Sequence, residues 1–99
     1  MEKVVWTKLA LKDVIQIHDY IAQDSLFYAQ QTVEKIFEKV VPLEKYPLLG
    51  RIVPEFNNQQ VREVIMGNYR IVYRINKKHI SIVRVHHSAR NISRRKKKA

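Results

Sequence analysis

The spacing of apolar residues changes once along this chain, and that change limits which folds are possible. In the first half, apolar residues recur every three to four positions, which is typical of amphipathic helices. One helix is expected from about Lys8 to Gln23, on the apolar positions Ala10, Val14, Ile17 and Ile21. Asp24-Ser25 interrupts the pattern, and a second helix follows on the apolar positions Ala29, Val33, Ile36, Phe37 and Val40. Pro42 lacks a backbone N–H and should end or kink that helix, and the two helices should form an antiparallel hairpin.

From residue 61 onward the pattern alternates, as in β-strands. We expect strands over 61–66, 69–75 and 79–87, with a two-residue turn of the II′ type at Gly67-Asn68. In 79–87 both alternating sets are partly apolar, so this strand should be central or contain a bulge. A short strand at Val4–Trp6 precedes the first helix, which Thr7 can cap, and residues 50–60 read as a loop. The order β-α-α-β-β-β predicts an α+β fold, with the helical hairpin packed on one face of a small, largely antiparallel sheet and the other face open.

Charge is concentrated in the second half of the chain. Residues 1–60 carry 7 Lys and Arg against 8 Asp and Glu, whereas residues 61–99 carry 12 against Glu63 alone, which gives the net charge of +10. This asymmetry indicates a polyanionic partner, either nucleic acid or an acidic protein segment. A basic face that serves only solubility is the alternative.

Size and composition exclude several classes of protein. The 99 residues suffice for one domain, expected over 1–90, with a basic, flexible tail over 91–99. The absence of cysteine excludes disulfides and thiolate metal sites, and no metal or cofactor is expected, because the four histidines lack a ligand spacing and the two glycines form no phosphate-binding loop. No apolar run reaches the roughly 18 residues of a membrane span, and residues 1–7 lack the layout of a signal peptide. A cytoplasmic protein with no membrane partner is therefore expected.

Strand alternation places basic residues on the open face of the sheet. In 69–75, Arg70 and Arg74 share one face with Val72, and the opposite set looks like core. Arg62 can join them from the preceding strand, and Arg84 is a candidate whose face parity alone does not decide. Guanidinium groups grip phosphates with two prongs, so these residues make a candidate phosphate-binding surface. Arginine that merely solvates an exposed strand is the equally simple reading.

One group of residues suggests catalysis. His86-His87 lies near Arg84, and histidine can supply the base and the acid that RNA cleavage requires. Glu55 can act as a base if its loop folds over the sheet. Two histidines at the end of a strand are usually not an active site, so the pattern alone does not favour an enzyme.

The stretch from Trp6 to Arg90 resembles the RelE/ParE superfamily of toxins. The matching segments, in order, are Trp6-Thr7 with Ala10, Asp13-Val14-Ile15, Tyr20-Ile21-Ala22, Tyr46-Pro47, Gly50-Arg51, Pro54-Glu55, Val61-Arg62-Glu63, Tyr69 to Ile75, Val83 to His86, and Ala89-Arg90. The resemblance implies a growth-inhibiting toxin held silent by a cognate antitoxin whose C-terminal segment folds on binding. That segment would lie over the hairpin, at Val14, Ile17, Ile21, Val33 and Phe37.

The superfamily divides by target, and this sequence has features of both branches. RelE-like members cut mRNA on the ribosome; there Arg70 matches an arginine used on phosphate, and Arg84 to His87 resembles an Arg-x-His-Tyr ending in which His87 replaces the tyrosine. ParE-like members poison DNA gyrase, and the His87-Ser88-Ala89-Arg90 ending is closer to theirs. We therefore favour a ParE-like toxin, with no catalytic residue and a target-binding set of Arg62, Arg70, Arg74, Arg84 and Arg90. The alternative is a ribosome-dependent mRNA endonuclease that uses Arg70, Arg84, His86, His87 and Glu55.

Overall fold

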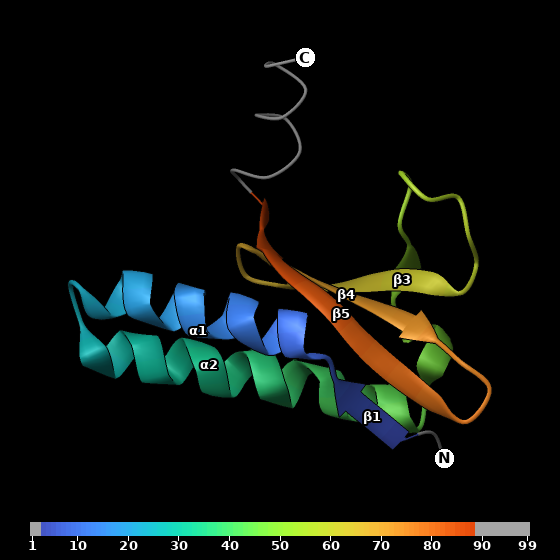
Figure 1. Cartoon of the computed structure of the whole chain (residues 1–99), viewed down its shortest axis with the longest axis horizontal. Helices are drawn as coiled ribbons and strands as arrows, with labels where there is room; N and C mark the ends of the chain where they lie inside the picture. The colour runs from blue at the N-terminus through green and yellow to red at the C-terminus, as the bar shows by residue number, and fades with distance from the viewer. Residues whose placement is uncertain (1–2, 89–99) are drawn as a thin grey trace.

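A computed structural model describes residues 3–88 of the chain, so Arg90 and the tail expected over 91–99 lie outside the described residues. Two helices lie on one side of a five-stranded sheet (Figure 1). The elements are β1 (Lys3–Trp6), α1 (Lys8–Ala22), α2 (Leu26–Val40), the 3₁₀ helices η1 (Val41–Glu44) and η2 (Pro47–Leu49), β2 (Arg51–Ile52), β3 (Val61–Met66), β4 (Tyr69–Ile75) and β5 (His79–His87). The α+β fold expected from the sequence is confirmed.

The helices begin and end where the sequence predicts. The Thr7 hydroxyl accepts a hydrogen bond from the Ala10 amide at 3.1 Å, and the Ser25 hydroxyl accepts one from the Tyr28 amide at 3.1 Å, so each helix has a side-chain N-cap. α2 ends at Val40, and Pro42 lies in the 3₁₀ turn that follows. Pro42 has no N–H to donate to the carbonyl one turn back, so the α-helix ends before it, whereas a proline is tolerated in the first turn of the 3₁₀ helix.

The strands follow the order β1-β5-β4-β3-β2, with β1 parallel to β5 and the other pairs antiparallel. The interpretation of residues 50–60 as loop throughout was wrong at its start, because Arg51 and Ile52 pair with Glu63 and Arg62 as strand β2. Gly67 has a φ of +59°, and Asn68 is not among the described residues with positive φ. This combination is the one required by the expected type II′ turn.

β5 is both central and bulged. It lies between β1 and β4, and its pairing with β4 shifts so that Val72 faces Arg84 while Tyr73 faces Ile82. The shift leaves Val83 as an extra residue and reverses the alternation of side chains beyond it. Ile80 and Ile82 before the shift, and Val85 after it, therefore all enter the helix-side core, which explains why both alternating sets of this strand contain apolar residues.

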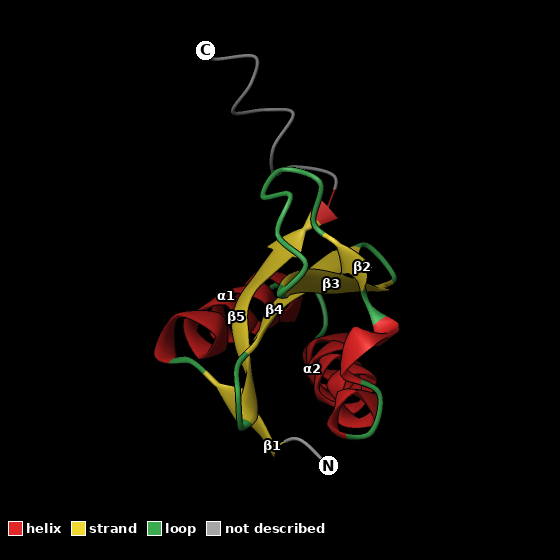
Figure 2. Ribbon diagram, turned by 90° about the vertical axis from the view of Figure 1, so that its right-hand side faces the viewer, coloured by secondary structure: helices red, strands yellow, loops and turns green. Residues whose placement is uncertain are grey.

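The sheet buries apolar residues on both faces. The main core, between sheet and helices, includes the fully buried Ile36, Ile71 and Tyr73. On the other face, Val53 packs with Val61, Val72 and the partly buried Val83 in a second, smaller cluster. The expectation of an open second face was therefore wrong in part, because the loop between β2 and β3, which projects beside the strands in Figure 2, brings Val53 onto it.

Candidate functional site

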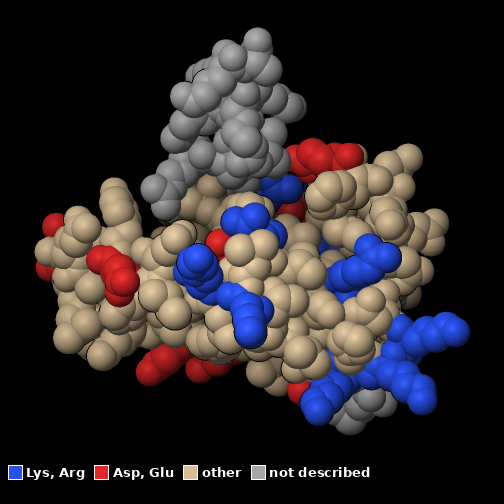
Figure 3. Space-filling model, viewed as in Figure 1, with Lys and Arg blue, Asp and Glu red and all other residues tan. Residues whose placement is uncertain are grey.

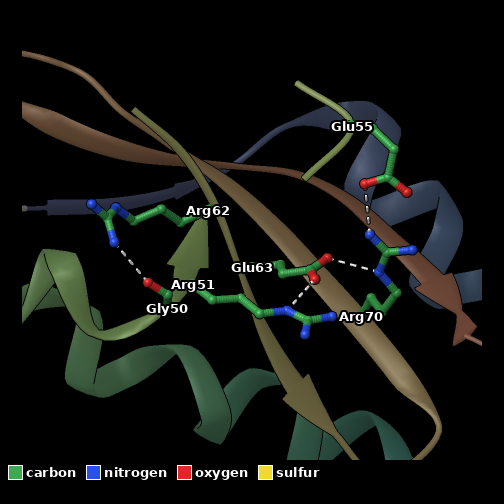
Figure 4. A network of polar contacts seen from close by, with 6 residues as sticks. All are labelled: Gly50, Arg51, Glu55, Arg62, Glu63 and Arg70. Carbon is green, nitrogen blue, oxygen red and sulfur yellow. Dashed lines mark hydrogen bonds and ion pairs between the residues drawn. The ribbon is translucent and has the colours of Figure 1, made fainter. Parts of the chain in front are cut away.

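A buried carboxylate organises the arginines on the sheet face opposite the helices. Glu63 is 1% exposed, and its two oxygens accept hydrogen bonds from Arg51 Nε and Arg70 Nε, both at 2.7 Å. Glu55, from the loop above, adds a longer contact of 3.5 Å to Arg70 Nη2 (Figure 4). A buried charge is tolerated only when it is paired and hydrogen-bonded, and two guanidinium groups meet that requirement for Glu63. Arg70, a candidate phosphate ligand, is thus already bound to protein carboxylates.

Arg62 points to the other side of the sheet, so its expected grouping with Arg70 and Arg74 was wrong. In the β3–β4 register it lies opposite Tyr73, a residue of the helix-side core. Its guanidinium donates to the carbonyl oxygens of Gly50 at 2.9 Å and Gln59 at 3.0 Å. Figure 4 shows it turned away from the Glu63 network. Arg62 therefore anchors the segment that leads into β2.

Tyr73 also holds this segment, through hydrogen bonds to Pro47 and Gly50. The buried Tyr73 hydroxyl donates to the Pro47 carbonyl oxygen at 2.6 Å and accepts from the Gly50 amide at 2.9 Å. A Cβ atom at Gly50 would lie 2.6 Å from the Glu63 carbonyl oxygen and 2.7 Å from the Tyr73 hydroxyl, so only glycine fits here. Burial raises the pKa of Tyr73 above its ordinary value of 10.0, although the Gly50 amide and the Arg62 charge oppose the rise.

Arg84 is held by helix α1. β1 covers β5 only as far as Ile82, and Asp13 of α1 takes over the strand edge beyond, where its Oδ2 accepts from the Val85 amide at 2.9 Å. The same carboxylate receives Arg84 Nε at 2.8 Å and Nη2 at 3.1 Å. These side-chain hydrogen bonds raise the pKa of Arg84, more than its partial burial lowers it. The second candidate phosphate ligand is therefore also paired with a carboxylate.

The two histidines lie on opposite faces of β5. His86 is opposite Arg70 in the strand register and shares its face. His87 is opposite Tyr69, whose ring it meets edge-on at 5.1 Å between centroids. The residues predicted for a nuclease are therefore divided between the two faces: Glu55, Arg70 and His86 come to one face, and His87 lies on the other.

Arg74 differs from the other arginines of residues 3–88. It is exposed, faces Val61 across the β3–β4 ladder, and its guanidinium makes no hydrogen bond or ion pair with a described residue. It lies on the same sheet face as Arg70 and Arg51. On the face seen in Figure 3, separate groups of basic side chains lie at the centre and right of the molecule, and none is seen at the free end of the hairpin at the left.

An apolar groove of about 330 Å³ runs along the outer side of the helical hairpin. Its lining residues are Leu11, Val14, Ile15, His18, Val33 and Phe37. Val33 and Phe37 thus lie where the sequence predicts an antitoxin surface. Val14, which also lines the groove, and Ile17 are only 4% and 6% exposed and Ile21 packs against the core, so the predicted part of these three in antitoxin binding stays a prediction. Leu11 and Ile15, 38% and 58% exposed, also line the groove, and the sequence did not single them out because helical periodicity marks the centre of the apolar stripe and not its edge.

Two further findings concern residues 3–88. No group of three or more His, Asp and Glu side chains in this range is placed to hold a metal ion. No helix in the same range is long and apolar enough to cross a membrane.

Comparison with known proteins identifies the family. Residues 4–92 match the family described as the ParE toxin of the type II toxin–antitoxin system parDE. Toxin RelE2 of Caulobacter vibrioides is 36% identical over 91 residues, which is 91% of this chain and 99% of that protein. A structure of the chromosomal ParDE system from P. aeruginosa is similar with a TM-score of 0.74 and 27% identity, over 88% of this chain and 96% of that one. The RelBE2 complex of Mycobacterium tuberculosis shares the fold, with a TM-score of 0.58 and 24% identity over 87% of this chain and 96% of that one.

The helical hairpin on a mixed sheet is thus the architecture of toxins from type II toxin–antitoxin systems. The chain belongs to the ParE toxin family, within the RelE/ParE superfamily.

Proposed function

We propose that this toxin stops growth by binding DNA gyrase through protein–protein contacts and breaks no bond itself. The observation that carries the proposal is the pairing of Arg70 with Glu63 and of Arg84 with Asp13. A nuclease needs cations that are free to meet the charge developing on the scissile phosphate. Here the charge of each guanidinium is already compensated by a carboxylate, so an incoming phosphate competes with that carboxylate for the cation. Displacement of Arg70 from Glu63 would leave this buried carboxylate facing the exposed Arg51 alone.

The placement of the histidines supports the same reading. A general base and a general acid must both come within hydrogen-bond reach of the reacting atoms. Because His86 and His87 extend to opposite faces of β5, they do not serve one phosphate together. Gyrase poisoning requires no such pair.

The antitoxin partner is proposed for the groove on the outer side of the hairpin. The similar structures from P. aeruginosa and M. tuberculosis are of toxin–antitoxin systems. In this chain the groove exposes an apolar surface to solvent, which is typical of a protein-binding site. Leu11, Ile15 and Phe37 are at least 36% exposed along it. An amphipathic antitoxin segment that folds on binding would bury these side chains.

The second candidate function is a RelE-like, ribosome-dependent mRNA endonuclease. One observation favours it, since Arg70 and His86 face each other across the β4–β5 ladder with Glu55 near Arg70. In this mechanism His86 would act as the base or acid and Arg70 would bind the phosphate.

Mapping of mRNA 5′ ends after induction of the toxin without antitoxin separates the two functions. We expect growth arrest with intact messages, retention of arrest in His86→Gln and His87→Gln, and stabilised gyrase–DNA cleavage complexes in a purified assay. New 5′ ends phased to codons, abolished by His86→Gln, would instead establish the nuclease. Arrest without cleavage complexes and without new ends would contradict both.

A further inference from the structure

A pocket on the sheet face away from the helices contains Arg74, the one arginine of residues 3–88 whose guanidinium has no hydrogen-bond or ion-pair partner in this range. In residues 3–88, Arg51 and Arg70 bind Glu63, Arg84 binds Asp13, and Arg62 binds backbone carbonyls. Arg74 has no such partner and lines a pocket of about 350 Å³. The other lining residues are Phe56, Asn58, Val61 and Val83. This volume is at the lower end of the range for small-molecule sites.

The pocket is built by two irregular features of the fold. The bulge in β5 adds Val83 to this face, where it packs with Val61 in the second apolar cluster. The β2–β3 loop is tied to the start of β3, because the Val53 amide donates to the Val61 carbonyl oxygen at 3.2 Å and the Val61 amide donates to that of Asn58 at 3.0 Å. The tied loop presents Phe56, 62% exposed, as a wall. The floor and one wall are therefore apolar.

The polar groups of the pocket are hydrogen-bond donors. Asn58 Oδ1 already accepts from the Gln60 amide at 2.8 Å, which leaves the Asn58 amide nitrogen for another molecule. The Arg74 guanidinium supplies the charge. Two donors beside an apolar floor match a carboxylate next to an apolar side chain. A phosphate is a poorer match, because its larger negative charge would meet only one unpaired cation. A nucleobase is also a poorer match, because its polar edge would lie against Val61 and Val83 without hydrogen-bond partners.

We propose that this pocket binds a peptide partner by an apolar side chain, seated on Val61 and Val83, and by an adjacent carboxylate, held by Arg74 and Asn58. The carboxylate is either an Asp or Glu side chain or the C-terminal carboxylate of the peptide. The proposal goes beyond the choice between gyrase and mRNA, and the lining of this pocket shares no residue with the hairpin groove and does not include His86.

The test is an NMR titration of the isotopically labelled full chain, with the backbone amides and the Arg74 side-chain Nε–H as reporters. One probe is N-acetyl-leucine, which has a terminal carboxylate; a second is N-acetyl-leucyl-aspartyl-amide, which has a side-chain carboxylate only. N-acetyl-leucine amide, without a carboxylate, and uridine monophosphate are the comparison ligands. Lys78→Gln is the matched control for Arg74→Gln, because it removes the same charge from the exposed β4–β5 turn outside the pocket.

We expect at least one carboxylate probe to shift Asn58, Val61, Val83 and the Arg74 Nε–H, and the better of the two identifies the source of the carboxylate. Arg74→Gln should weaken that binding about tenfold, the usual worth of a charge-assisted hydrogen bond, while Lys78→Gln leaves it unchanged. The proposal is overturned if neither carboxylate probe binds, if N-acetyl-leucine amide or uridine monophosphate binds more tightly, or if both variants lose affinity equally. None of these outcomes depends on growth arrest, so a failure here is distinct from a failure of the proposed function.

Discussion

Replacing Glu63 with glutamine should destabilise this toxin by about 3 kcal/mol. The carboxylate is 1% exposed and accepts two 2.7 Å hydrogen bonds from charged groups. The two ion pairs contribute differently to the free energy of unfolding, because the Arg51 side chain is 64% exposed and the Arg70 side chain only 12% exposed. Loss of the exposed pair costs up to about 1 kcal/mol, and loss of the buried one about 3 kcal/mol. The glutamine amide oxygen still accepts one bond, which returns about 1 kcal/mol.

The measurement is urea unfolding at pH 7, followed by circular dichroism, with thermal melting as a second assay. For a domain of this size the loss corresponds to a melting temperature lower by about 15 °C. Glu55→Gln is the matched control: its 3.5 Å contact to Arg70 is partly exposed, and its loss should cost no more than about 0.5 kcal/mol. A loss below about 1 kcal/mol for Glu63→Gln, with an unchanged dependence on urea, would refute the reasoning that this carboxylate holds Arg70 in place.

Three more predictions test other parts of the structure. Tyr73→Phe removes the bonds to Pro47 and Gly50 and should cost about 1–2 kcal/mol in urea unfolding. Because burial raises the pKa of Tyr73 in the folded state, the wild-type chain should lose stability as the pH rises above 10.0, and the phenylalanine variant should lose less over the same range; equal slopes would exclude this linkage. Asp13→Ala leaves both Arg84 and a strand-edge amide unpaired and should cost about 3 kcal/mol, whereas Arg84→Gln, which keeps the strand-edge bond, should cost clearly less; the reverse order would contradict the role given to Asp13. Ile15→Ser should weaken antitoxin binding about tenfold in calorimetry with little change in melting temperature, while Gln16→Ser next to it should leave affinity unchanged; similar effects of the two would place the antitoxin elsewhere.

The two helices and the strands β1, β3, β4 and β5 were predictable because each is encoded by a local pattern, whereas the two-residue β2 was taken for loop. Thr7 and Ser25 mark the helix starts, Pro42 marks an end, and the alternation of 69–75 marks a strand with one apolar face. Apolar residues in both alternating sets of β5 predicted a strand that is central or bulged, and the structure shows that it is both. Burial of Val53, Val61 and Val72 on the second face was not, because it depends on where a loop folds back.

The arrangement of charged groups was less predictable, because it depends on contacts far apart in the sequence. Arg62 looked equivalent to Arg70, but the two residues that flank it, Val61 and Glu63, are buried on the face away from the helices. The sequence did mark Glu63 as unusual, since it is the sole acidic residue among residues 61–99. The pairing of Asp13 with Arg84 had none, because it exists only where β1 stops short of the end of β5.

The parallel pairing of β1 with β5 has a consequence for how the toxin is made. Lys3 to Trp6 align with His79 to Ile82, and Thr7 donates both its amide and its hydroxyl to the Ile82 carbonyl oxygen, at 3.1 and 2.8 Å. Contacts between segments so distant in the chain form late and slow the folding reaction. During translation, the first strand has no partner until most of the chain has left the ribosome, while the two helices between them can already associate. The hairpin groove, where we propose that the antitoxin binds, would then be present on the nascent chain before the sheet is complete, so binding there would begin before the toxin is fully folded.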